Sequence, residues 1–220
     1  MADILPNNIP APGETVQAIF NYNDIVSGQG YADFYLMSVW DGSADNYILR
    51  DTAIRSTLDF VSVAHNSNTD YEFSSGLFNS PRLVLADSKI IIELSSFIDD
   101  QYTGSETMTQ TLTCTLYKNT GEVVSAVAKT HSYTNSGANI KQFRTTIVMT
   151  PSSDIMFKIG DYVKLKVNVA SGASSNSSSV TGLNINPLGE DSTGFAAPGD
   201  SQQDDRSTIS KISIPFKNNL

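Results

Sequence analysis

The chain has 220 residues, with Lys+Arg 14 against Asp+Glu 23 and a formal net charge of -9 at pH 7. This length can bury a substantial core. The shortage of basic residues argues against a nucleic-acid partner, because neutralising phosphates needs clustered Lys and Arg. It also disfavours an anionic membrane surface.

The first 14 residues favour an extended arm, because three prolines interrupt them. The segment is either a frayed terminus, which is the usual case, or an arm laid on the chain's own body or on a neighbour, because its few apolar side chains need a partner surface. We therefore take these side chains as interface candidates: Ile4, Leu5 and Ile9.

The start of the chain has no basic region followed by an apolar run, so it does not read as a secretory signal. Cys114 is the single cysteine and cannot form an intrachain disulfide. No apolar run is long enough to cross a bilayer. We expect a soluble protein that folds in a reducing cytoplasm.

From residue 15 onward, short alternating segments separated by turn residues predict strands. Only a turn or two around 53–58 has any helical character. About a dozen such strands predict an all-β fold, an antiparallel β-sandwich or jelly roll over residues 15–220. The predicted strands are 16–22, 31–40, 47–50, 58–64, 71–74, 82–86, 89–96, 107–118, 122–133, 139–150, 162–170, 180–186 and 208–216.

The clearest strand is 107–118, where a threonine row alternates with Met108, Leu112, Cys114 and Leu116. This pattern predicts one core face and one wet face. The link 119–121 contains Gly121 and predicts a hairpin. A further turn at 135–137 then leads to 139–150, so the sequence predicts a three-strand meander over 107–150.

Two low-complexity segments complete the chain. Residues 172–179 are rich in Ser and predict a flexible hairpin tip. Residues 187–206 carry Gly, Pro and acidic side chains without periodicity, and predict an excursion before the last strand. That strand alternates Ile212 and Ile214 with Lys211 and Ser213, so we expect the C-terminus to be built into the sheet.

The stretch 157–169 contains a Gly160-Asp161 turn that opens an alternating strand. It resembles the penultimate strand of jelly-roll domains related to tumour necrosis factor and the complement-type globular heads, a resemblance that covers about 60 residues and suggests a trimer. The Pro-Asn arm, threonine-rich strands and Ser/Asn loops also resemble the small jelly-roll proteins of tailed-phage virions, such as head decoration and fibre components. The resemblance implies a structural role in a virus particle.

Catalytic chemistry has few candidates. A nucleophilic triad would need one of only two histidines, and we interpret His65 as a strand-end residue and His131 as part of a wet strand face. Cys114 lies on an apolar strand face and is expected to be a small buried hydrophobe rather than a thiolate. One cysteine and two distant histidines cannot form a tetrahedral zinc site.

A calcium loop is a weaker alternative. Asp41, Ser43 and Asp45 stand at the first, third and fifth positions of such a loop, but Asn46 replaces the bend glycine and Thr52 stands where a bidentate Glu is needed. A solvated hairpin turn explains this segment better. We likewise expect the adjacent acids at 99–100 and 204–205 to lie on loops facing water.

Two further binding readings remain. Carbohydrate sites use exposed aromatics, but Trp40 ends an apolar strand and is expected in the core. The threonine row of 107–115 could form a flat face for ice or a partner sheet only if adjacent strands repeated it, so a wet sheet face is the better account.

Charge is distributed unevenly along the chain. Residues 1–110 carry 15 acids and 4 bases, whereas residues 111–220 carry 8 acids and 10 bases. Such polarity suits a subunit that docks between charged neighbours, although a random scatter over the surface explains it equally well. Lys164 and Lys166, on the outward side of a strand in the basic half, are therefore interface candidates.

These features predict a virion structural protein, a decoration, cement or fibre-type subunit that acts through protein interfaces with its own copies and with other capsid proteins. We expect no enzyme activity, cofactor, metal, nucleic acid or membrane partner, and assembly into the particle in the host cytoplasm. The alternative is a receptor- or glycan-binding module of a tail or surface assembly. A hydrolase with carboxylates in 187–206 is the third reading.

Overall fold

The computed structural model describes residues 29–40, 45–51, 59–100, 104–135, 139–173, 179–188 and 210–217. Within those ranges there is no helix of the length and apolarity that crossing a membrane requires. The described residues form these strands: β1 (Gln29–Trp40), β2 (Asp45–Arg50), β3 (Asp59–Ala64), β4 (Asn68–Ser75), β5 (Arg82–Val84), β6 (Ile90–Asp100), β7 (Glu106–Lys118), β8 (Gly121–Asn135), β9 (Asn139–Met149), β10 (Ile155–Phe157), β11 (Val163–Ala173), β12 (Val180–Leu188) and β13 (Lys211–Lys217).

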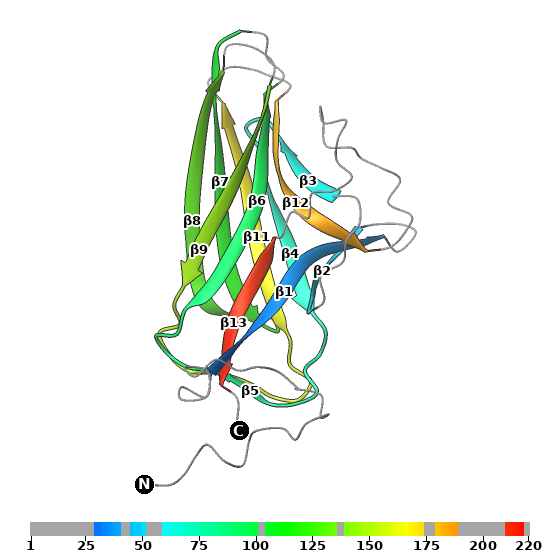
Figure 1. Cartoon of the computed structure of the whole chain (residues 1–220), viewed down its shortest axis with the longest axis vertical. Coiled ribbons are helices and arrows are strands. Elements are labelled where there is room, and N and C mark those ends of the chain that lie inside the picture. The colour runs from blue at the N-terminus through cyan, green and yellow to red at the C-terminus, as the bar shows by residue number, and fades with distance from the viewer. Residues whose placement is uncertain are drawn as a thin grey trace, which may run out of the picture.

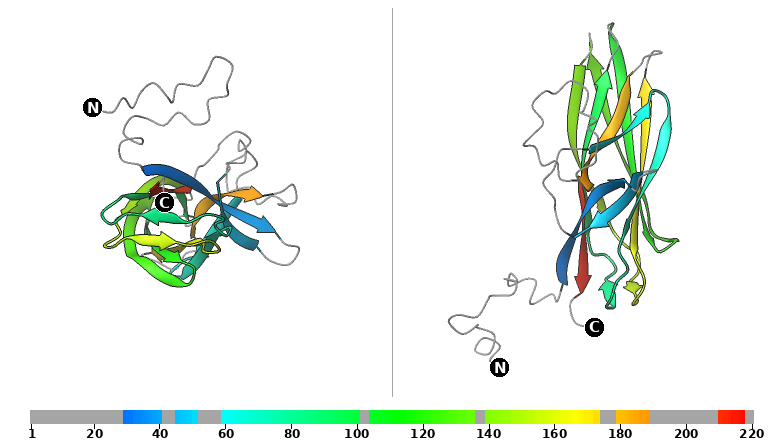
Figure 2. Two further views of the ribbon diagram at one scale, coloured as in Figure 1. Left: turned by 90° about the horizontal axis from the view of Figure 1, so that it is seen from below. Right: turned by 90° about the vertical axis from the view of Figure 1, so that its right-hand side faces the viewer.

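The strands fold into an elongated sandwich, which confirms the predicted all-β class (Figure 1). One layer contains β8, β7, β11 and β4, and the other contains β9, β6, β12, β13 and β1. Strand β2 joins the layers because it pairs with both β1 and β4. Most pairings are antiparallel, but β1–β12 and β2–β4 are parallel. Viewed along the long axis, the strands enclose a single core (Figure 2).

Strand β7 shows why the alternating pattern produces this core. Its inward side chains, Met108, Leu112, Cys114 and Leu116, are buried, as predicted. The threonine row lies on the outer face, where Thr107 and Thr111 pair with Thr134 and Thr130 of β8 through hydroxyl contacts of 2.8 and 2.9 Å. The outer threonines are half-buried except for Thr115, which is buried, so burial of the apolar inner face is what stabilises this strand.

The predicted meander is half right. Strands β7 and β8 form a hairpin through the turn 119–120, with Asn119 in the left-handed region at φ 54°. Strand β9, however, pairs with β6 along its whole length, and not with β8. The alternating pattern fixes which side chains face inward but does not choose the partner strand. Here Ile90 and Ile92 of β6 supply buried side chains opposite Met149 and Ile147.

Several predicted segments lie outside the described residues: the arm 1–14, the strand 16–22, the helical turn 53–58, and the greater part of 172–179 and of 187–206. Strand β10 was missed because it has only three residues. It pairs with β5, which is equally short, at the lower end of the molecule in Figure 1.

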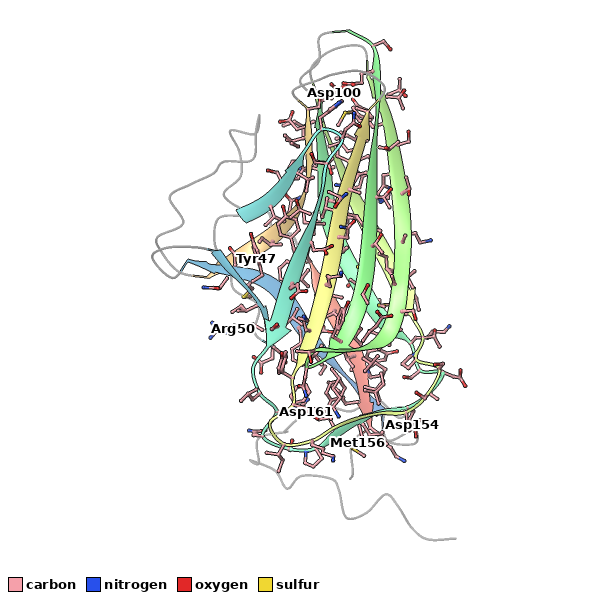
Figure 3. The ribbon with its side chains drawn as sticks, turned by 180° about the vertical axis from the view of Figure 1, so that it is seen from behind. Tyr47, Arg50, Asp100, Asp154, Met156 and Asp161 are labelled. Atoms are coloured by element: carbon pink, nitrogen blue, oxygen red, sulfur yellow. The ribbon has the colours of Figure 1, made fainter. Side chains whose placement is uncertain are left out.

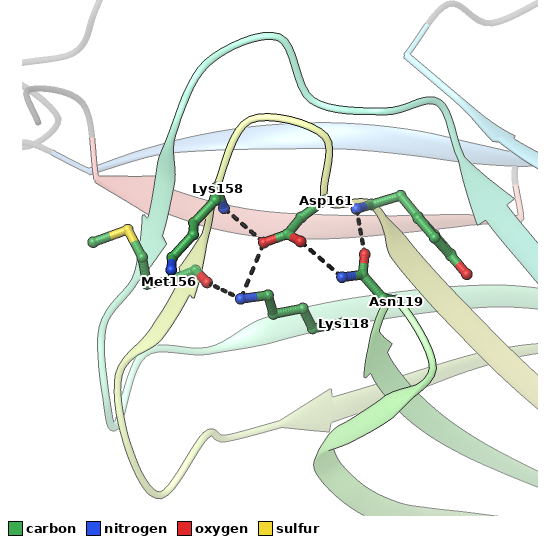
Figure 4. Close-up of polar contacts among 6 residues, drawn as sticks. Lys118, Asn119, Met156, Lys158 and Asp161 are labelled. Carbon is green, nitrogen blue, oxygen red and sulfur yellow. Dashed lines mark hydrogen bonds and ion pairs between the residues drawn. The ribbon is translucent and has the colours of Figure 1, made fainter.

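The predicted Gly-Asp turn is confirmed at the same end. Gly160 has φ +86°, a conformation that favours glycine. Asp161 then turns its carboxylate toward the β7–β8 hairpin, where it accepts hydrogen bonds from the Lys158 backbone N–H and from Asn119 Nδ2, both at 2.7 Å (Figure 4). Lys118 Nζ lies 3.0 Å from the same carboxylate and donates to the Met156 carbonyl.

Candidate interaction surface

The outer face of the layer where β6 lies between β9 and β13 carries apolar side chains at one end and a pocket at the other. The register places outward residues in rows across these strands, with Val148 of β9 beside Ile91 of β6 and Ile91 beside Ser213 of β13. Two residues further along, Glu93 lies between Thr146 and Lys211. We call this face the outer groove and define it by Tyr31, Ile91, Val148, Arg144 and Lys211.

The lower part of the outer groove is apolar. Val148, the penultimate residue of β9, is 46% exposed, and Tyr31, the third residue of β1, is 54% exposed. Tyr31 belongs to β1, and its hydroxyl donates a hydrogen bond to the carbonyl of Lys89 at 3.1 Å. Because Lys89 directly precedes β6 and β13 lies between β1 and β6, the ring extends across β13. Strands that present such side chains to water provide contact area for a partner.

The upper part is a charged pocket of about 350 Å³, lined by Glu93, Ser95, Arg144, Thr146 and Lys211 among others. Lys211 Nζ contacts carboxylate oxygens of Asp33 at 2.9 Å and of Glu93 at 3.5 Å. The hydrogen bond to Asp33 raises the pKa of Lys211, so the ammonium stays charged. Arg144 is exposed and forms no ion pair with any described residue.

This arrangement presents side chains that can bind a partner. Tyr and Arg are the side chains that contribute most at protein interfaces, because each combines a large planar surface with hydrogen-bonding groups. An Arg side chain with no carboxylate partner in its own molecule can bind the carboxylate of a partner through two parallel hydrogen bonds. The outer groove therefore fits a segment that carries apolar side chains next to an acid.

The predicted interface lysines lie on a different face. Lys164 of β11 pairs with Glu72 of β4 at 2.9 Å, and Lys166 pairs with Asp70 at 3.2 Å. Asn168 also donates to Asp70, and this hydrogen bond is the main cause of the lowered pKa of Asp70. The acidic and basic halves of the sequence thus neutralise each other locally on this face.

Most other predicted site residues cannot be placed. Ile4, Leu5 and Ile9 lie outside the described residues, as do Asp41 and Ser43 of the calcium alternative. Asp45 begins β2, where its backbone is paired with Trp40, but neither side chain is described. No group of three or more His, Cys, Asp or Glu that could hold a metal ion occurs in the described part of the chain.

The histidines lie apart. His65 lies at the turn after β3, as predicted, with Nε2 2.7 Å from Asn66 Nδ2. The prediction for His131 is wrong, since it points inward from β8. Its Nε2 lies 2.6 Å from the Thr145 hydroxyl and its ring stacks on Phe143 at 4.6 Å, so burial lowers its pKa.

Cys114 is fully buried, as predicted, and burial raises the pKa of its thiol to about 12. The thiol therefore stays protonated and unreactive at neutral pH. Cys114 is a packing residue of the core.

The adjacent acids at 99–100 contradict the prediction of a water-facing loop. Strand β6 extends four residues further than predicted, which brings Asp99 and Asp100 into the sheet between β9 and β12. Both are buried, and Ser179 donates its hydroxyl to Asp100 at 3.1 Å. Asp100 and Asp161 lie at opposite ends of the molecule (Figure 3). The pair at 204–205 lies outside the described residues.

Sequence reasoning missed the outer groove, although it left a signal. Val148 stands in the polar register of its strand, between Ile147 and Met149, both of which are buried. Tyr31 likewise occupies an outward position of β1. A large apolar residue at an outward position of a strand indicates an interaction face. The sequence does not show which strands lie beside it, because those strands come from distant parts of the chain.

Comparisons with known proteins add little. No family model matches the chain, and no curated protein matches it. Similar solved structures include a CocE/NonD family hydrolase from Staphylococcus aureus, with a TM-score of 0.49 and 12% identity, covering 86% of this chain and 37% of that chain. An aminopeptidase from a marine-sediment Thaumarchaeota archaeon gives 0.46 and 9%, with coverages of 87% and 37%.

An α-amino acid ester hydrolase gives a TM-score of 0.43 and 10% identity, covering 84% of this chain and 36% of that chain. The chain thus spans less than two fifths of the length of these structures. Similarity at this level carries no argument about activity, and the expectation that the chain is not an enzyme stays a prediction.

Proposed function

We propose that this chain is a structural subunit that works through protein–protein contacts, and that its assembly is a virus particle in which it serves as a decoration, cement or fibre-type protein. The observation that supports this most is the outer groove, where Tyr31 and Val148 are exposed next to Arg144. A partner that covered this face would remove apolar surface from water and supply a counter-charge.

The β-sandwich suits such a role mechanically. Its core is continuous from β5 and β10 at one end to β7 and β12 toward the other, so the body can transmit contact forces without rearranging. Among the described residues, β8 forms a backbone ladder only with β7, and β9 only with β6. The two strands nevertheless lie against each other, since His131 of β8 contacts Thr145 and Phe143 of β9, so the layers meet on this side of the sandwich.

The virion assignment rests on the resemblance of the Pro-Asn start, threonine-rich strands and Ser/Asn loops to small jelly-roll proteins of tailed-phage virions. The proposed partners are copies of the chain, with a trimer as the suggested state, and other capsid or virion proteins. No nucleic-acid or membrane contact is part of the proposal. Assembly would take place in the host cytoplasm.

Sedimentation equilibrium of the full chain over a wide concentration series tests this function. We expect a defined oligomer whose population rises with concentration by mass action. A chain that remains monomeric at several hundred micromolar would contradict self-association.

A glycan-binding role is the second candidate, because the upper pocket combines hydroxyl groups with charge. Ser95 and Thr146 line it together with Glu93 and Arg144, a polar set that can hydrogen-bond a sugar ring. Thermal unfolding with a panel of oligosaccharides, with and without calcium, tests this candidate. A rise in the midpoint that Arg144→Ala abolishes would support it, and no rise at millimolar sugar would exclude it.

A further inference from the structure

We propose that the outer groove binds residues 1–14 of a neighbouring copy of the chain. This inference rests on the proposed function and names the surface and the segment through which copies would associate. The position of the groove, its chemistry and its length all support it.

The position of the groove relates it to the N-terminal segment. Strand β1 begins at Gln29, which pairs with Lys217 at the lower end of the molecule. Two residues later, Tyr31 already forms part of the groove. The first described residue of the chain therefore lies at the lower border of this face.

The chemistry of the two partners matches. Residues 1–14 contain apolar Ile4, Leu5 and Ile9, two carboxylates at Asp3 and Glu14, and no Lys or Arg. The groove offers an apolar part with exposed Val148 and, at its upper end, the Arg144 guanidinium, which has no ion pair among the described residues. An extended segment with prolines also has fewer backbone N–H groups to satisfy, so it can lie on a sheet face without pairing to an edge.

The lengths also agree. Val148 and Arg144 are four residues apart on β9, about 13 Å along a strand. Ile9 and Glu14 are five residues apart and Pro10 and Pro12 lie between them, so in a polyproline-like conformation they span about 15 Å. One extended segment can therefore place Ile9 on Val148 and the Glu14 carboxylate on Arg144.

A neighbouring copy can supply this segment. Residues 15–28 connect it to β1 and extend to about 45 Å at most, a reach that includes the same groove on an adjacent subunit. Exchange of arms in this way would link subunits in a ring or a closed set, as symmetric oligomers require.

Cysteine mapping in the full chain tests the proposal. The only native cysteine is buried with a raised thiol pKa, so Cys114 does not compete. A chain carrying Ile9→Cys is mixed with an isotope-labelled chain carrying Val148→Cys, and the mixture is oxidised mildly. In a control mixture, Leu77→Cys replaces Val148→Cys. We expect the disulfide between Ile9→Cys and Val148→Cys to form at least about tenfold faster than in this control, because a tenfold difference already corresponds to a modest preference for one site.

Leu77 is a strict control because it is 70% exposed and lies on a loop outside the groove. Introducing Arg144→Ala into the Val148→Cys chain should slow the cross-link, whereas Lys158→Ala should leave it unchanged. If Val148→Cys fails to fold, Thr146→Cys offers an exposed position on the same face.

Three outcomes would overturn the inference. If Val148→Cys and Leu77→Cys formed a disulfide with the Ile9→Cys chain at equal rates, the cross-link would reflect random collision. In a chain that carries both Ile9→Cys and Val148→Cys, an intrachain disulfide without a link between chains would place the arm on its own subunit. An oligomer in sedimentation without any groove cross-link would leave the proposed function standing and remove only this inference.

Discussion

Asp161 and Asn119 join two loops that are 42 residues apart in the sequence. The carboxylate of Asp161 accepts the Asn119 Nδ2–H at 2.7 Å, and Asn119 Oδ1 accepts the Tyr162 backbone N–H at 2.9 Å. The backbone N–H of Asn119 also donates to the Tyr162 carbonyl at 3.0 Å. These reciprocal bonds fix the β7–β8 turn against the start of β11.

Replacing this carboxylate should destabilise the protein. Asp161→Asn keeps the side-chain shape but puts an NH₂ group where an oxygen now accepts from Lys158, Asn119 or Lys118. We expect a lower thermal midpoint at pH 7, measured by circular dichroism. Asp87→Asn is the matched control, since Asp87 is exposed and its φ of 60° suits Asn. Equal midpoints for the two variants would contradict this role.

The same contact predicts a pH dependence. Hydrogen bonds from the Lys158 backbone, Asn119 and Lys118 lower the pKa of Asp161 from 3.8 to about 2. Because the folded pKa is depressed, the stabilisation is fully present above pH 4 and is lost as the pH falls toward 2. The stability difference between wild type and Asp161→Asn, followed by urea unfolding, should therefore shrink over this window. A difference that stays constant down to pH 2 would refute the assignment.

Much of the fold could be predicted because alternation is a local property. The strand from Thr107 to Lys118 was placed within one residue of β7, and its inward residues are those that the pattern indicates. The pairing of β9 with β6 could not be predicted, since partners 39 to 59 residues apart leave no mark on the local pattern. The length of β6 was also underestimated, because Asp99 and Asp100 look like loop residues.

Gly182 should tolerate no side chain. A Cβ there would collide with the Val61 carbonyl and come within 2.7 Å of the Phe97 ring. We expect Gly182→Ala to cost about 1–3 kcal/mol in free energy of unfolding, because a backbone carbonyl must move. Gly76→Ala, where a Cβ meets nothing within 4 Å, should change the free energy by less than about 0.5 kcal/mol. Similar losses for both variants would contradict the close packing of β12 on β3.

Gln110 should be a major polar contributor to the core. It is fully buried, and its Nε2 lies 2.7 Å from the Thr181 hydroxyl and 3.1 Å from the carbonyls of Phe97 and Gly182. Gln110→Ala leaves these acceptors buried and opens a cavity, so we expect a loss of about 2–4 kcal/mol in urea unfolding. The exposed Gln142→Ala should be nearly neutral. A neutral Gln110→Ala would show that water satisfies these groups.

The candidate interaction surface was harder to predict than the fold. Its parts come from β1, β6, β9 and β13, and only their register brings Tyr31, Val148 and Arg144 to one face. The lysines that the sequence favoured, Lys164 and Lys166, already have carboxylate partners on β4. Sequence shows which residues are charged, but the partner that neutralises each charge depends on the topology.

The association constant of the full chain, measured by sedimentation equilibrium for Val148→Asp against Leu77→Asp, tests the central claim most directly. A charge at Val148 would have to be buried within the outer groove, so we predict association at least about tenfold weaker than wild type. Leu77→Asp should associate as wild type does, although Leu77 is the more exposed side chain. Unchanged association of Val148→Asp, or a wild-type chain that never associates, would contradict the account.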